Sequence, residues 1–220
     1  MIVTPQRRAA SHPRRRLAVV AACCAAALAA GLAAASPASA DRNYTVRFTQ
    51  NAQGDITGTG NTLMTCRDDD DKCAAARNGT ASGADNNNNN RSVRYVDIDT
   101  DATTFDSSAA TLALPAGARV LFAGLYYGGR TQAGDRGSPA PDVTARNKVL
   151  IRPPNLGAYI PLTARPADVD DAPVNPAAGA AFRLYQGFVD VTDIVRSAGA
   201  GEYTVANVLL GTGLQADQSG

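Results

Sequence analysis

The chain has 220 residues, with 21 Lys and Arg against 20 Asp and Glu, four Cys, one His and no Trp. Residues 1–40 hold five of the arginines, no acidic residue and the one histidine, so residues 41–220 carry 16 basic and 20 acidic side chains. Without histidine, that part cannot form a Ser-His-Asp or Cys-His catalytic group or a His-ligated zinc site. Its net negative charge also excludes the basic face that nucleic-acid binding requires.

Residues 1–40 have the order of a secretory signal peptide. An arginine-rich segment precedes an almost wholly apolar one, residues 17–35, and Pro37 and the small residues 38–40 follow. We predict Sec-type export, with cleavage between Ala40 and Asp41, and a secreted, extracellular or cell-surface protein. A retained membrane anchor is the alternative, and the alanine-rich apolar segment disfavours it. The mature chain is then expected to contain no membrane span.

Alternating apolar and polar residues predict strands from residue 44 onward. The first two predicted strands are residues 44–49 and 55–66. Residues 67–91 hold a run of four Asp, a run of five Asn and almost no large apolar residue. This composition predicts a mobile surface loop.

The alternation resumes after this loop and predicts strands at 91–99, 110–114, 120–127, 149–152, 159–163, 182–191 and 203–210. The segment 120–127 is apolar on both faces, as in a central strand. One short helix is expected at 193–198, with Thr192 as its N-cap and Gly199 at its end. The pattern predicts an all-β fold, an antiparallel β-sandwich of Ig-like or jelly-roll-like type, over residues 41–220. Only seven residues follow the apolar segment 205–213, so we expect a C-terminally incomplete sandwich and a fragment of a longer polypeptide.

Six motifs together resemble a known group of proteins. They are GNTLMTC at 60–66, YVDID at 95–99, LPAG at 114–117, AGLYYGG at 123–129, FVDVT at 188–192 and GEYTVANV at 201–208. In this order they resemble the N-terminal region of large secreted or cell-surface proteins of actinobacteria. That region usually precedes repeated Ig-like modules of unknown function. The group tends to have Trp where this chain has Tyr127, and it continues with a Trp-containing strand. The resemblance implies no catalytic residues.

Two cysteines outside the leader, Cys66 and Cys73, flank six residues. In a chain bound for an oxidising compartment, such a pair predicts a disulfide. A redox or metal role is disfavoured, because two thiols without a further Cys or His make a poor site.

Four carboxylates lie close together in the sequence, at Asp97, Asp99, Asp101 and Asp106. Alternate acidic residues at the end of a strand can supply several of the oxygens that Ca²⁺ binds. The other interpretation is a solvent-facing strand edge that ends in Asp and Ser turns. Apart from this calcium alternative, we expect no cofactor.

Tyr127 is a candidate ligand-binding residue. Tyr126 and Tyr127 are neighbours on a predicted strand, so one faces the core and the other the opposite face. An exposed tyrosine could stack on a sugar ring, whereas burial of both would mean core packing. A glycosidase would have to use aspartates, of which Asp55, Asp190 and Asp193 are candidates for paired-carboxylate chemistry.

These observations favour a non-catalytic, exported β-sandwich module with a structural or adhesive role. Its expected partners are cell-wall or other extracellular surface components. The alternative is a carbohydrate-binding module or an aspartate-dependent glycosidase domain.

Overall fold

The computed structural model describes residues 45–67, 70, 72–83, 91–134, 136–170 and 184–214. The predicted signal peptide, with its cleavage point at Ala40 and Asp41, and parts of the loop predicted at 67–91 lie outside the described residues. The chain divides into two compact units, Met1–Arg47 and Phe48–Gly220. The elements, core and sites discussed below belong to the second unit.

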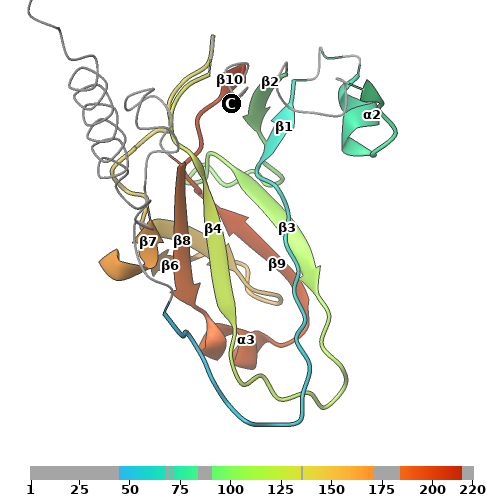
Figure 1. Ribbon diagram of the computed structural model, residues 1–220, viewed down its shortest axis with the longest axis vertical. Helices are drawn as coiled ribbons and strands as arrows, with labels where there is room; N and C mark the ends of the chain where they lie inside the picture. Colours follow the sequence, from blue (N-terminus) through green and yellow to red (C-terminus); the bar gives the residue numbers. More distant parts are fainter. Residues whose placement is uncertain are drawn as a thin grey trace, which may run out of the picture. The chain divides into compact units, whose positions relative to one another are not determined.

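Antiparallel strands form most of the regular structure in the second unit (Figure 1). The strands are β1 (Met64–Cys66), β2 (Ser92–Tyr95), β3 (Ser107–Leu112), β4 (Gly124–Arg130), β5 (Lys148–Arg152), β6 (Ile160–Thr163), β7 (Val169–Asp170), β8 (Leu184–Asp190), β9 (Gly201–Ala206) and β10 (Gly213–Leu214). The helices are α2 (Cys73–Arg77), the 3₁₀ turn η2 (Pro166–Asp168) and α3 (Thr192–Ala198). Strands greatly outnumber helices, so the predicted all-β class is confirmed.

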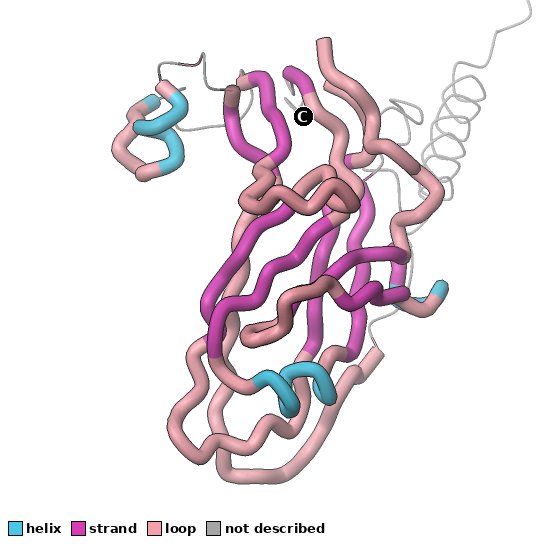
Figure 2. Tube along the Cα trace, turned by 180° about the vertical axis from the view of Figure 1, so that it is seen from behind, coloured by secondary structure: helices cyan, strands magenta, loops and turns pink. Residues whose placement is uncertain are grey.

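The strands form three sheets (Figures 1 and 2). A four-stranded sheet has the order β3-β9-β5-β6, a three-stranded sheet has the order β4-β8-β7, and a small sheet has the order β1-β2-β10. Every pair is antiparallel. Among the described strands, β3 and β4 are therefore both edge strands, each paired on one side only.

The four-stranded and three-stranded sheets share two hydrophobic clusters. Tyr127 of β4 and Tyr185 of β8 belong to one cluster with Val149 of β5. In the second, Ile151 of β5 is packed against Leu125 of β4. Burial of apolar side chains is the main stabilising contribution in such clusters. Side chains from both sheets thus build the core.

The first two predicted strands are largely wrong. Residues 45–63 contain no strand, and only Met64–Cys66 of the predicted segment 55–66 pairs, as β1. Phe48 is 43% exposed and Ile56 is 95% exposed, so the alternation there does not reflect a buried face. Sequence alternation predicts a strand only where a second strand and a core are available to receive it.

The segment 120–127 also differs from its prediction as a central strand. The strand begins later, at Gly124, and β4 pairs only with β8. Its outward face is exposed at Tyr126. The apolar residues on both faces arise from aromatic packing on the outside of the sheet and core packing on the inside.

Of the two α-helices, α3 agrees with the prediction and α2 was not predicted. α3 covers Thr192–Ala198 and ends at Gly199, whose φ of 73° suits glycine. Thr192 is the first helical residue rather than the N-cap, and its hydroxyl accepts a hydrogen bond from the Ala123 N–H at 2.9 Å. α2 lies in the segment predicted to be a mobile loop, where a run of three alanines favours a helix.

Close packing between Gly187 and Tyr127 gives a test of the fold. A β-carbon at Gly187 would lie 2.3 Å from Cζ of the Tyr127 ring. We therefore expect Gly187→Ala to displace that ring and to lower the free energy of unfolding by about 1–3 kcal/mol. Urea denaturation with the disulfide intact measures this change.

Gly157→Ala is the matched control, because nothing lies within 4 Å of a β-carbon at that position. Its effect should stay within about 0.5 kcal/mol. Equal midpoints for the two variants would contradict the packing described.

Candidate functional site

The predicted disulfide between Cys66 and Cys73 is confirmed. It joins the end of β1 to the start of α2, with 5.8 Å between the two Cα atoms. Both cysteines are buried. Next to the bridge, Arg91 forms a salt bridge with Asp70, and this hydrogen bond holds the pKa of Asp70 below its ordinary value. The disulfide and the Arg91–Asp70 ion pair together hold α2 beside the small sheet.

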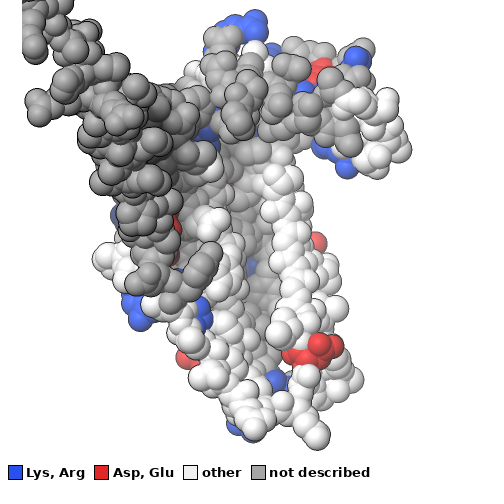
Figure 3. All heavy atoms as spheres, viewed as in Figure 1, with Lys and Arg blue, Asp and Glu red and all other residues white. Residues whose placement is uncertain are grey.

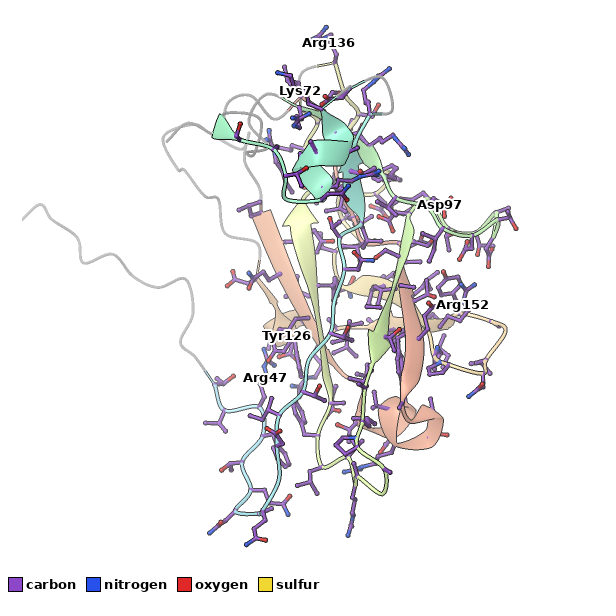
Figure 4. The ribbon with its side chains drawn as sticks, turned by 90° about the vertical axis from the view of Figure 1, so that its right-hand side faces the viewer. Arg47, Lys72, Asp97, Tyr126, Arg136 and Arg152 are labelled. Atoms are coloured by element: carbon purple, nitrogen blue, oxygen red, sulfur yellow. A yellow bond between two sulfur atoms is a disulfide. The ribbon has the colours of Figure 1, made fainter. Side chains whose placement is uncertain are left out.

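Two of the carboxylates considered for calcium are held by protein side chains. The Ser107 hydroxyl donates to Oδ1 of Asp97 at 2.7 Å. The Tyr159 hydroxyl donates to Oδ2 of Asp99 at 2.5 Å, and a guanidinium nitrogen of Arg152 lies 3.3 Å from the same oxygen. Figure 4 labels Asp97 and Arg152 on the same side of the sheets. These contacts stabilise the turn after β2 through protein groups.

The other two candidates lie in different surroundings. Asp101 accepts hydrogen bonds from the backbone N–H of Thr103 at 2.9 Å and from its hydroxyl at 2.7 Å, within an exposed turn. Asp106 is fully buried. Among the described residues, no group of three or more His, Cys, Asp or Glu side chains could hold a metal ion. Calcium binding stays a prediction from the sequence. Thermal melting with and without a chelator tests it, because a bound ion would raise the thermal midpoint.

Asp106 is an unusual carboxyl group. Its Oδ1 accepts a hydrogen bond from the Val208 N–H at 3.1 Å, whereas its Oδ2 is buried without a hydrogen-bond partner in the described part of the chain. Burial raises the pKa of Asp106 to about 7. The folded protein therefore binds a proton at this residue in a pH range where an unfolded chain has lost it.

The two neighbouring tyrosines on β4 face opposite ways. Tyr127 is 8% exposed, lies in the core, and donates a hydrogen bond from its hydroxyl to the Arg146 carbonyl at 3.1 Å. Tyr126 is 66% exposed on the other face. The sequence singled out Tyr127 as the candidate for ligand stacking, but the structure places the exposed tyrosine at Tyr126. Figure 4 shows Tyr126 on the side of the sheets opposite to Arg152.

Tyr126 belongs to a row of aromatic rings, which we call the aromatic row: Phe48, Phe122, Phe188 and Tyr126. The ring centroids of Phe48 and Phe122 are 5.2 Å apart with an interplanar angle of 9°. Phe122 and Phe188 follow at 6.3 Å and 18°, and Phe188 and Tyr126 at 5.0 Å and 52°. Such distances are typical of favourable aromatic packing. The two ends of the row, Phe48 and Tyr126, are the exposed members.

Gly124 makes this arrangement sterically feasible. A β-carbon there would lie 2.6 Å from the Phe188 ring, so the bare backbone of β4 leaves room for that ring. The row joins residues from the N-terminal segment, β4, β8 and the segment before β4. The row was not predicted from the sequence, because the strand pattern at Phe122 and Phe188 indicated only core packing.

A cavity of about 840 Å³ borders the same strand. Its walls come from both large sheets, from residues 56–64, and from Phe122 and Tyr126 of the aromatic row. Figure 3 shows the face of the molecule where a hollow runs beside that segment, with mostly uncharged residues in view. No pattern in the sequence predicted this cavity.

The aspartates considered for glycosidase chemistry make local contacts. Asp55 accepts a hydrogen bond from the Ile56 N–H at 2.7 Å. Asp190 accepts one from the Thr192 N–H at 2.9 Å, at the start of α3. Asp193 lies 3.2 Å from the Arg196 guanidinium on the same helix. Each therefore has a structural role at a turn or a helix end.

The buried carboxyl of Asp106 predicts a pH dependence of stability. Because its pKa is about 7 when folded and 3.8 ordinarily, the folded state binds more protons between these values. The free energy of unfolding then falls as the pH rises from about 4 to about 7, by at most about 4 kcal/mol. Asp106→Asn keeps an acceptor for the Val208 N–H but cannot ionise. We expect this variant to lose that slope and to be more stable than the parent protein at pH 8.

Urea denaturation of the parent protein and of Asp106→Asn at pH 4.5 and pH 8 measures how the free energy of unfolding of each protein changes with pH. Asp193→Asn serves as the control, because its carboxylate is on the surface. That variant should retain the slope of the parent protein. If Asp106→Asn also retained it, the ionisation of Asp106 would not be its cause.

The comparisons with known proteins leave the site to be judged on its geometry. No protein-family model, no curated protein and no solved structure matches the chain. Within the described residues, no helix has the length and apolar character needed to cross a membrane.

Proposed function

We propose that this chain is an exported β-sandwich module of a bacterial extracellular or cell-surface protein, with an adhesive role. The arginine-rich leader and its small-residue cleavage site support export. The Cys66–Cys73 disulfide suits an oxidising compartment. The two clusters shared by the large sheets support the sandwich architecture.

The aromatic row is the observation that carries the adhesive role. Its exposed ends, Phe48 and Tyr126, present large apolar surfaces on the outer face of the three-stranded sheet. Aromatic rings supply much of the binding energy at recognition surfaces, because they offer a large contact area at a low cost in side-chain entropy. Tyr126 adds a hydroxyl that can exchange hydrogen bonds with a polar ligand.

Sugar rings of cell-wall or other surface glycans fit this chemistry best. A pyranose ring has an apolar face of C–H groups and a polar rim of hydroxyls, so it can stack on an aromatic ring and still form hydrogen bonds. Carbohydrate binding is thus the form of adhesion that the row favours. The local roles of Asp190 and Asp193 at the start of α3 support a binding module rather than a glycosidase.

A screen of cell-wall preparations and arrayed glycans tests the proposal with Tyr126→Ala. The variant removes the most exposed ring of the row, and we expect it to weaken binding by about tenfold or more. Tyr126 lies on the outer face, so the fold should be retained, and an unchanged thermal midpoint will verify this.

Leu156→Ala is the matched control. Leu156 is also an exposed, large apolar residue, but it lies between β5 and β6. The Leu156→Ala variant should bind glycans as the parent protein does. Glycan binding that survives Tyr126→Ala would place the site elsewhere, and a parent protein that binds no glycan would leave only a structural role.

A further inference from the structure

The cavity beside β4 is large and opens to the surface along residues 56–62, which are exposed. Its volume of about 840 Å³ is within the range of small-molecule sites, roughly 300–1,000 Å³. The cavity borders β4 along residues 124–128 and reaches two members of the aromatic row, Phe122 and Tyr126.

The walls of the cavity are mostly apolar. Alternate residues of β3 line one side, at Ser108, Ala110 and Leu112, and they are joined by Tyr203 and Val205 of the neighbouring β9. Other lining residues come from β4, from β5 and from the α3 region. Among the described lining residues, none is Asp, Glu, Lys, Arg or His. A charged group would have no counter-charge in this space and would pay a large desolvation penalty there.

The hydroxyls of two tyrosines in the walls are already hydrogen-bonded to the backbone. The Tyr203 hydroxyl donates to the Gly199 carbonyl at 2.7 Å, and the Tyr127 hydroxyl donates to the Arg146 carbonyl at 3.1 Å. These tyrosines present ring carbons to the cavity and direct their hydroxyls to backbone carbonyls. The interior thus favours a hydrocarbon chain over a polar molecule.

Residues 56–63, which we call the strap, run over the opening between β3 and β4 (Figures 1 and 3). The strap forms no strand, and residues 56–62 are exposed. It is held near its C-terminal end, where the Asn61 side-chain amide donates to the Ala109 carbonyl at 2.8 Å and the Val96 N–H donates to the Leu63 carbonyl at 2.9 Å. Nothing lies within 4 Å of a β-carbon placed at Gly58 or Gly60. A segment with so few contacts can move aside at little cost.

We infer that the cavity binds an uncharged, lipid-like molecule, whose hydrocarbon chain enters between the edges of β3 and β4 beneath the strap. The chain lies against Ala110, Leu112 and Tyr203, and the neutral head group stays at the strap, where Thr57 and Thr59 offer hydroxyls. Phe122 and Tyr126 of the aromatic row also line the cavity, so the two sites adjoin, but lipid binding against Ala110 and Leu112 does not depend on the adhesive role.

The neutral fluorescent probe N-phenyl-1-naphthylamine tests the cavity directly, because its emission rises in apolar surroundings. We expect saturable binding to the parent protein and displacement by glycerol monolaurate, which has an uncharged head group. Ala110→Phe fills the cavity from the wall and should reduce probe binding by at least tenfold. Thr111→Phe places the same ring on the opposite, exposed face of β3 and should leave binding unchanged.

A second measurement does not depend on the folding of Ala110→Phe. The chain contains no tryptophan, so Leu114→Trp introduces a single such residue in the cavity wall. Bound probe should then accept energy from this residue, and glycerol monolaurate should abolish the transfer. Absence of saturable binding to the parent protein, or equal binding by Ala110→Phe and Thr111→Phe, would overturn the inference. Displacement of the probe by extended apolar peptides but not by glycerol monolaurate would overturn it in favour of a polypeptide strand.

Discussion

In the antiparallel pair of β4 and β8, Tyr127 lies opposite Gly187, and Tyr126 lies opposite Phe188. This register determines what each face of the three-stranded sheet can do. Opposite residues share a face, so the inner face combines a tyrosine with a glycine and the outer face combines two aromatic rings. A shift by one residue would exchange the faces, exposing Tyr127 and burying Tyr126. Both the core around Tyr127 and the aromatic row depend on this single pairing.

The same strand also borders the cavity, whose walls are mostly apolar. Water that enters from the opening gains few hydrogen bonds from these walls. An apolar occupant releases this water and buries apolar surface, which stabilises the complex by roughly 25 cal/mol for each Å². The hydrophobic effect therefore favours an apolar occupant.

Local features of the structure could be predicted from the sequence, and non-local ones could not. The spacing of Cys66 and Cys73 predicted the disulfide, and the glycine after the short helix predicted where α3 ends. Alternation also located β5, β6 and β8 to within about two residues. These signals depend on residues that are close in the sequence. Tyr127 was singled out in place of Tyr126 because the alternation shows that two neighbours face opposite ways but not which of them faces the core.

The aromatic row and the cavity depend on contacts between distant segments. Phe48, Phe122 and Phe188 meet only after β4 has paired with β8 and the N-terminal segment has come to lie beside them. The burial of Asp106 also depends on a distant segment. In the sequence this residue stands close to acidic residues that were expected to be exposed, so nothing nearby predicted its burial. Its burial follows from the return of the chain at Val208, about a hundred residues later.

The composition of the strap explains why the cavity persists. β3 and β4 both present an unpaired edge toward the opening, and an exposed edge invites pairing with another strand. The strap lies where such a strand would be, yet Gly58 and Gly60 have no side chains to fill the space beneath it. A segment with large apolar residues at alternate positions would bond to an edge and fill the cavity, as in an ordinary closed core. Because the strap is held at Asn61 by a side chain rather than by a strand ladder, it covers the edge of β3 while the space beneath it stays accessible.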